Sequence, residues 1–283
     1  MPLNNPPMDR RRWLQCAAAV AAGSTPLLAG AATAAAPTGR LRDYLLMRGA
    51  LDDRLVVAAL TGQYYGVIDS ELIPMFGVLA VTFTRWRPLG DGRWLSTSFE
   101  NAYYTDADSG EVMTQWRNPI TGQSVPVLVH TSRPTSLVLH EDLSRHHVKP
   151  LPPGAVAEDR VSSMEELGGE LVANQRVRTA LVRPAPAAPY RYSELVTVRA
   201  PLAALRDPAA RQVPANMSFT NVSGWRPWQQ MPAGQPGHMM AHGAGRYGLT
   251  LDALPARWLA ETRRSKPGWW ADPASHLEAV FRA

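Results

Sequence analysis

Short apolar runs of the kind found in β-strands, separated by turn residues, dominate residues 50–230. No sustained apolar period of 3.6 residues occurs in this region, so long amphipathic helices are not expected there. The pattern predicts strands at 55–61, 64–69, 78–87, 94–104, 112–117, 125–130, 136–140, 171–182, 191–199 and 217–222.

Turn residues connect several of these runs directly. Segments 89–92, 106–110 and 118–122 each place Gly, Asn, Asp or Pro between two runs, which predicts successive hairpins. Antiparallel neighbours joined by short links favour a mainly β fold, either a barrel, including a calycin-like one, or a strongly curved sheet.

Helices are expected mainly near the C-terminus. Segment 255–264 carries Trp258, Leu259 and Thr262 at helical spacing, and Asp272-Pro273 is typical of a helix start before 274–281. A further short helix is predicted at 163–167. It follows a proline-rich loop near 144–160, which we interpret as a loop within one β-rich domain over residues 35–283.

The first 34 residues have the pattern of an export signal. Arg10 and Arg11 precede an alanine-rich apolar stretch at 16–32, as in twin-arginine signals, and Ala32-Thr33-Ala34 provides a cleavage site. This predicts a bacterial periplasmic protein that meets the twin-arginine translocase during export. The apolar stretch is only marginally hydrophobic, which argues against the alternative of a plain membrane anchor. Because cleavage removes this stretch, no stable membrane insertion of the mature chain is expected.

Composition supports a folded globular protein and narrows the function classes. Apolar residues make up 45% of the chain and charged residues 19%. The formal net charge is +5, but the basic residues are scattered, so no nucleic-acid partner is expected. Cys16 is the only cysteine and lies within the predicted signal, which leaves the mature chain without a disulfide, a thiolate nucleophile or a cysteine metal ligand.

Common catalytic and cofactor motifs are absent from the sequence. It has no Gly-x-Ser-x-Gly, Ser-x-x-Lys, His-Glu-x-x-His or Walker motif. Gly243 to Gly248 match Gly-x-Gly-x-x-Gly, but without a convincing strand before them or a helix after them. We interpret this segment as a glycine-rich loop, and no cofactor is predicted.

The segment 224–243 concentrates Trp, Met, His and Gly. Trp225 and Trp228 are suited to stack on a ligand or simply to fill the core. His238 and His242 would share one face of a helix at metal-ligand spacing, with methionines as soft ligands, but no third protein ligand is identifiable. Hydrogen bonding to backbone or substrate is the alternative, and no metal is predicted.

A second group of polar residues comes from neighbouring predicted strands. Glu100, Tyr103, Tyr104, Asp106 and Arg117 are partly brought together by a curved sheet, although strand alternation prevents Tyr103 and Tyr104 from both pointing inward. Tyr, His, a carboxylate and Arg suffice for proton transfer at an enolisable or epoxide-like substrate. An ordinary satisfied polar network is the alternative.

These groups supply the candidate site. The catalytic candidates are His238, His242, Tyr104, Arg117 and Asp106, and the candidates for substrate contact are Trp225, Trp228, Tyr65 and Trp116.

Several phrases resemble a bacterial family named domain of unknown function 1838, many members of which carry twin-arginine signals. They are LMRGALD at 46–52, YYGV at 64–67, PMFGV at 74–78, AYYTD at 102–106, GEV at 110–112, WRNPITG at 116–122 and WRPW at 225–228. The resemblance spans about residues 41–265 and implies neither an activity nor catalytic residues.

The function expected from these features is binding of a small apolar or aromatic molecule in a β-rich protein, with cofactor-independent lyase, isomerase or hydrolase activity. A non-catalytic carrier, a His/Met metal-binding protein and an interaction module are the alternatives, so the sequence leaves open whether the protein is an enzyme.

Overall fold

The structure is a computed structural model that describes residues 37–132, 134–182, 189–268 and 272–281. The predicted export signal, with Cys16, lies outside the described residues. The helices are α2 (Gly39–Arg48), α3 (Leu202–Leu205), η1 (Pro227–Gln229), η2 (Leu251–Ala253), α4 (Ala256–Ser265) and α6 (Pro273–Phe281). The strands are β1 (Val56–Ile68), β2 (Glu71–Gly90), β3 (Arg93–Thr105), β4 (Gln115–Arg117), β5 (Ser124–Pro126), β6 (His130–Thr131), β7 (Thr135–Leu139), β8 (Ser144–His147), β9 (Val156–Leu167), β10 (Glu170–Leu181), β11 (Tyr190–Pro201), β12 (Ala215–Ser223) and β13 (His238–Leu249).

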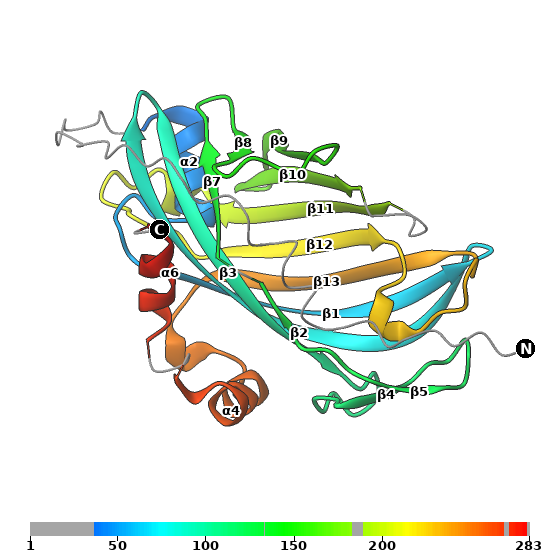
Figure 1. Cartoon of the computed structure of the whole chain (residues 1–283). Coiled ribbons are helices and arrows are strands. Elements are labelled where there is room, and N and C mark those ends of the chain that lie inside the picture. The colour runs from blue at the N-terminus through cyan, green and yellow to red at the C-terminus, as the bar shows by residue number, and fades with distance from the viewer. Residues whose placement is uncertain (1–36, 133, 183–188, 269–271, 282–283) are drawn as a thin grey trace, which may run out of the picture. The chain divides into compact units, whose positions relative to one another are not determined.

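Ten antiparallel strands form a closed barrel, which confirms the predicted mainly β fold (Figure 1). Their order is β2-β1-β13-β12-β11-β10-β9-β8-β7-β3, and pairing of β3 with β2 closes the ring. Short β6 adds to β3, and β4 and β5 form a separate hairpin. Closure removes the exposed edges that an open sheet of this size would have.

The two faces of β3 bury side chains against different partners. Tyr104 belongs to the core inside the barrel, whereas Tyr103 packs outside it against Trp258 of α4, in the cluster that also holds Leu277 of α6. The Tyr103 hydroxyl lies 2.9 Å from Thr262 Oγ1. The predicted opposition of the two tyrosines is therefore confirmed, and the C-terminal helices cover the outside of β2 and β3 (Figure 1).

Helix α2 fills one end of the barrel. Tyr44, Leu45 and Met47 are almost completely buried among residues of the barrel interior. The Tyr44 hydroxyl donates to Gln175 Oε1 of β10 over 3.0 Å, which ties the helix to the wall. Helix α2 therefore closes this end of the barrel with apolar side chains.

Glycines permit close contact between β1 and β13. A Cβ on Gly243 would lie 2.2 Å from the Thr61 carbonyl oxygen, and one on Gly245 would lie 2.3 Å from that of Ala59. The prediction of a glycine-rich loop at 243–248 is therefore wrong, because these residues continue strand β13. Their small size is needed for strand packing.

Other differences from the predicted elements have similar tertiary causes. Segment 163–167 is the end of β9 rather than a helix, because its backbone pairs with β10. The predicted strands 55–61 and 64–69 form one strand, β1, with a register shift between Tyr64 and Tyr65.

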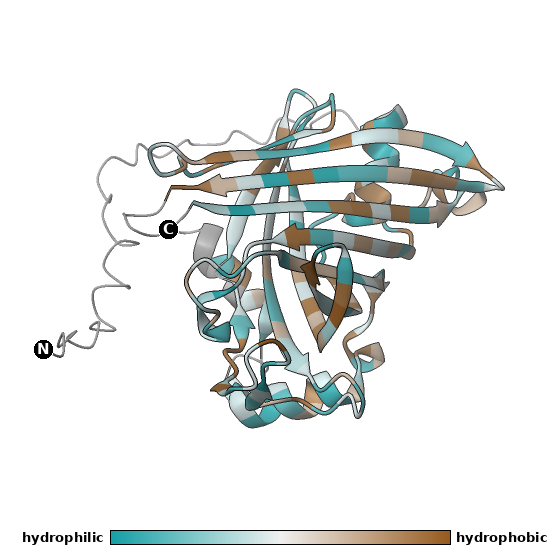
Figure 2. Cartoon of the chain, turned by 90° about the vertical axis from the view of Figure 1, so that its right-hand side faces the viewer, coloured by the Kyte–Doolittle hydropathy of each residue, from teal (hydrophilic) through white to brown (hydrophobic). Residues whose placement is uncertain are grey.

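Figure 2 shows hydrophobic and hydrophilic residues alternating along much of the barrel wall. Among the described residues, no helix is long and apolar enough to span a membrane.

Candidate functional site

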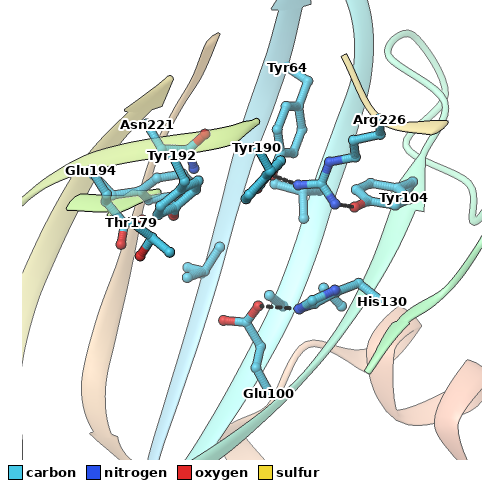
Figure 3. A pocket seen from close by; sticks show the side chains of 15 residues that line it. Tyr64, Glu100, Tyr104, His130, Thr179, Tyr190, Tyr192, Glu194, Asn221 and Arg226 are labelled. Carbon is cyan, nitrogen blue, oxygen red and sulfur yellow. Dashed lines mark hydrogen bonds and ion pairs between the residues drawn. The ribbon is translucent and has the colours of Figure 1, made fainter. Parts of the chain in front are cut away.

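A cavity of about 350 Å³ lies inside the barrel, near the end of β3 and the start of β11 (Figure 3). Strands from both halves of the barrel contribute to it, and Arg226 enters from the segment after β12. The lining residues are Leu60, Tyr64, Val78, Ala80, Glu100, Ala102, Tyr104, His130, Thr179, Tyr190, Tyr192, Glu194, Phe219, Asn221 and Arg226. A polar cavity of this size suits a small organic molecule.

Arg226 is held between two tyrosines. Its Nη1 donates to the Tyr104 hydroxyl and its Nη2 donates to the Tyr64 hydroxyl over 3.0 Å. The guanidinium carbon lies 5.3 Å and 5.4 Å from the centroids of the Tyr64 and Tyr104 rings. Nε is buried without a hydrogen-bond partner among the described residues. The cavity therefore contains a cation whose tyrosine partners carry no formal charge.

The segment carrying Arg226 is anchored by hydrogen bonds at η1. Gln229 Oε1 accepts from the Arg226 backbone amide over 2.7 Å, and Asn118 Nδ2 donates to the Gln229 carbonyl oxygen over 3.1 Å. Both Asn118 and Gln229 are fully buried. Because these bonds restrain the backbone, the guanidinium is positioned before any ligand binds.

Tyr64 and Tyr104 are suited to donate hydrogen bonds. Burial raises the pKa of both hydroxyls, while the nearby charge of Arg226 opposes the rise. Both tyrosines therefore stay protonated at neutral pH. Each oxygen accepts a hydrogen bond from Arg226, so the hydroxyl hydrogen remains available to a ligand oxygen. Together with Arg226 they form a site for developing negative charge on that oxygen.

Glu100 provides a titratable carboxyl group in the same cavity. Its Oε2 accepts from Thr82 Oγ1 over 3.2 Å, and its Oε1 lies 3.7 Å from His130 Nε2. Burial, followed by the negative charge of Glu194, raises the pKa of Glu100 to about 7. Although 34% of this side chain is accessible, Glu100 lines the cavity, so the accessible surface lies within the barrel. A carboxyl with this pKa can accept and return a proton near neutral pH.

His130 stays neutral beside Glu100. Burial, together with the positive charges of Arg226 and Lys266, lowers the pKa of His130 below its usual value. Its charge therefore does not neutralise Glu100 at neutral pH. The imidazole can instead hydrogen-bond a ligand or exchange a proton with the carboxyl group.

The opposite wall of the cavity is also polar. Tyr190, Tyr192 and Glu194 follow one another at every second position of β11, and Asn221 lies on neighbouring β12 (Figure 3). Burial raises the pKa of Glu194 and of Tyr192. Asn221 Oδ1 is buried without a hydrogen-bond partner among the described residues. This wall therefore offers hydrogen-bond donors and acceptors to a ligand.

Aromatic side chains support Tyr104 from behind. Phe76 and Trp228 pack against it, with the Tyr104 and Trp228 ring centroids 5.5 Å apart, and Trp116 packs against both Phe76 and Trp228. The Trp116 indole donates to the Met75 carbonyl oxygen over 3.1 Å. Trp116 and Trp228 are thus placed in the packing around the site, outside the set of residues that line the cavity.

Of the nine residues chosen from the sequence, Tyr104 alone lines this cavity. Arg117 is exposed on β4, and Asp106 Oδ1 accepts from the Ser109 backbone amide over 2.8 Å in a turn. Tyr65 follows the register shift in β1 and lies outside the cavity lining. Trp225 is half-buried and donates to the Gln235 carbonyl oxygen over 3.3 Å.

His238 and His242 lie on the outer face of β13. They alternate with Met239 and Ala241, whose side chains are fully buried in the barrel core. His242 is exposed, and its Nδ1 lies 3.0 Å from Thr220 Oγ1. Residues four apart on a strand are separated by about 13 Å, so the shared metal-binding face expected on a helix is not formed. The described residues contain no group of three metal-ligating His, Cys, Asp or Glu side chains.

Several residues of the cavity were not among the candidates predicted from the sequence. Tyr192 and Glu194 alternate along the predicted strand 191–199 and Tyr190 immediately precedes it, which was a detectable signal for one polar face. Arg226 stands between two tryptophans, and no local motif marks it as a site residue. Glu100 belongs to the predicted polar group but is not one of the nine candidate residues.

Comparison with known proteins identifies a family for this chain but no similar curated protein. A family model described as "Protein of unknown function (DUF1838)" matches residues 55–280. No curated protein shows a significant match to the sequence.

Proposed function

The chain belongs to the DUF1838 family, and because that description carries no activity, we propose a function from the cavity: proton transfer, of the isomerase or lyase type, on a small organic substrate. The observation that carries the proposal is the presence in one cavity of Glu100, with a pKa of about 7, and the Arg226–Tyr64–Tyr104 group. The first can move a proton, and the second can stabilise the negative charge that this movement creates.

The substrate oxygen is proposed to bind at the tyrosines. A carbonyl oxygen would accept from the hydroxyls of Tyr64 and Tyr104. The Glu100 carboxylate would then remove a proton from the adjacent carbon, leaving the bonding electrons to form an enolate. Its negative charge would lie on the oxygen facing Arg226 and the two tyrosines.

The protonated Glu100 completes the reaction in one of two ways. Return of the proton to a different carbon gives isomerisation. Departure of a group from the β-carbon, with protonation of that group, gives elimination and a lyase reaction. The raised pKa values of Tyr64 and Tyr104 favour their action as hydrogen-bond donors, so Glu100 is assigned the proton transfer.

The rest of the lining supports a substrate that combines apolar and polar parts. Leu60, Val78 and Phe219 provide apolar surface, while Asn221 and Thr179 provide hydrogen-bonding groups. The aromatic residues Trp116 and Trp228 are assigned to support Tyr104 rather than to stack on the substrate.

Export to the periplasm is a second part of the proposal. It is supported by Arg10-Arg11 and the Ala32-Thr33-Ala34 cleavage pattern. Replacement of both arginines by lysine is expected to leave the protein uncleaved and inside the cell, as measured by fractionation and mass spectrometry.

The proposed chemistry can be tested without the natural substrate. Ketones with acidic α-hydrogens, such as 2-tetralone, are first screened for binding by ligand-observed NMR. A binding ketone is then incubated with the protein in deuterated buffer, and replacement of its α-hydrogens is followed. Glu100→Gln is expected to abolish the catalysed exchange, whereas Glu141→Gln, at an exposed position, is expected to preserve it.

The decisive comparison is between binding and exchange. Exchange that depends on Glu100 supports the proposal. A ketone that binds in the cavity but shows no exchange above the buffer rate contradicts it and favours the carrier alternative.

A further inference from the structure

A second chamber of about 290 Å³ lies beside the cavity within the barrel. Thr179 and Glu194 line both spaces, so the two chambers adjoin along β10 and β11. The second chamber also contains Arg48 from the end of α2 and Arg145 from β8. A ligand longer than the first cavity could therefore extend between the two groups of polar residues.

Arg145 already has an anionic partner in this chamber. Its Nη1 lies 3.0 Å from Asp159 Oδ2, and the two side chains are only 9% and 12% exposed. Asp159 Oδ1 also accepts from Gln175 Nε2 over 2.6 Å. The charge of Arg145 is thus balanced, but its Nε is buried without a hydrogen-bond partner among the described residues.

Arg48 forms no ion pair with a carboxylate within 4 Å in the described part of the chain. Its guanidinium carbon lies 4.5 Å from the centroid of the Tyr247 ring, and its Nη1 is buried without a hydrogen bond. Burial raises the pKa of the nearby Glu194 carboxyl, while the positive charge of Arg48 opposes the rise. The chamber therefore presents buried, unsatisfied N–H groups on two arginines. Such groups are costly to bury without an acceptor.

We infer that the second chamber binds a carboxylate group of the substrate, with Arg48 as its principal partner, while the reacting part of the same molecule lies beside Glu100 and Arg226. A carboxylate supplies two acceptor oxygens, which match the unsatisfied donors of Arg48 and Arg145, and its negative charge strengthens hydrogen bonds from guanidinium groups. A phosphate dianion would bring a second negative charge close to Asp159. The inference rests on the proposed function for the reacting end and specifies the substrate class as an elongated organic monocarboxylate.

Binding of 5-phenylpentanoate and of its primary amide provides the test. The two probes differ in charge but little in shape, and calorimetry gives their dissociation constants. The wild-type protein is expected to bind the carboxylate at least about tenfold more tightly, equivalent to about 1.4 kcal/mol. Arg48→Met is expected to abolish this preference, and Arg48→Lys is expected to retain part of it.

Two further variants locate the carboxylate. Arg176→Met removes an exposed arginine from the outer face of β10 and is expected to preserve the preference. Arg226→Met removes the cation of the first cavity and is also expected to preserve it. A wild-type protein without the preference, or a preference lost in Arg226→Met but kept in Arg48→Met, would overturn the inference.

These measurements are separate from the test of catalysis. Glu100→Gln should still prefer the carboxylate probe even though it loses hydrogen exchange. If the wild-type protein catalyses hydrogen exchange but shows no carboxylate preference, carboxylate binding in the second chamber alone is refuted. If it shows the preference but no exchange, the proposed function alone is refuted. If Arg48→Met does not fold, the wild-type comparison and Arg48→Lys remain decisive.

Discussion

Arg226 donates a hydrogen bond to the hydroxyl of Tyr104, although 122 residues separate the two along the chain. The contact joins the segment after β12 to the end of β3. It also places a buried guanidinium beside a hydroxyl that stays protonated, because burial raises the pKa of Tyr104. Closure of the barrel thus creates a hydrogen-bond-donating site from residues that no local motif connects.

Removal of the Arg226 charge should impair catalysis. Arg226→Met keeps much of the aliphatic stem but removes the donors to Tyr64 and Tyr104. We expect the exchange rate of a bound ketone to fall by about 10²–10³, the usual effect of losing a donor to a developing oxyanion. NMR measurement of deuterium incorporation checks this, with Arg176→Met as the exposed control. An exchange rate within twofold of wild type would show that the guanidinium does not contact the reacting oxygen.

The rate of exchange should increase with pH through the titration of Glu100. Because the pKa of Glu100 is raised to about 7, the carboxylate that acts as base is scarce at pH 5 and predominant at pH 8. A pH–rate profile with a midpoint near 7 is expected for a bound ketone, after subtraction of the buffer-catalysed rate. A midpoint near the ordinary glutamate value would contradict the assignment.

Glu100 should also affect stability in a pH-dependent way. Its pKa is raised from 4.5 to about 7 on folding, so between these values the folded state binds more protons than the unfolded state. This carboxyl therefore lowers stability as pH rises through that window. At pH 8, Glu100→Gln should melt at a higher temperature than wild type, by about 2–4 °C for each kcal/mol gained in the free energy of unfolding. The difference in melting temperature should disappear below pH 4.5. Thermal unfolding followed by circular dichroism at both pH values tests the sign.

His238 and His242 should be dispensable for the proposed chemistry. Both lie on the outer face of β13, whereas the cavity lies within the barrel. The double substitution His238→Ala and His242→Ala is expected to leave the hydrogen-exchange rate within about twofold of wild type. A loss comparable to that of Glu100→Gln would move the active site to the outer face.

Gly243 should be essential for packing of β13 on β1. A Cβ there would meet the Thr61 carbonyl oxygen at 2.2 Å and the Gly62 Cα at 2.6 Å, both of them backbone atoms that cannot rotate away. Gly243→Ala should therefore destabilise the barrel by about 1–3 kcal/mol, as overpacking commonly does. Gly224→Ala is the matched control, because its Cβ would meet nothing within 4 Å. Urea unfolding of both variants measures the difference, and equal midpoints would contradict the prediction.

Local patterns in the sequence were sufficient for many of the strands and turns. The turn at Asp91-Gly92 joins β2 to β3, and that at 118–122 joins β4 to β5, because Gly and Asn readily adopt the required backbone conformations. The opposition of Tyr103 and Tyr104 likewise followed from strand alternation. The sequence by itself thus determined a mainly β protein with C-terminal helices.

Tertiary structure decided which face of each strand is inside. Alternation separates His242 from Ala241 but does not say which of them points into the barrel, and the helices α4 and α6 bury apolar residues on the outside of β2 and β3 as well. Pairing of β3 with β2 closes the ring and brings Glu100 into one cavity with Arg226 and Glu194. These contacts are non-local, and the raised pKa of Glu100 arises from burial and neighbouring charge, so the candidate site exists only in the folded barrel.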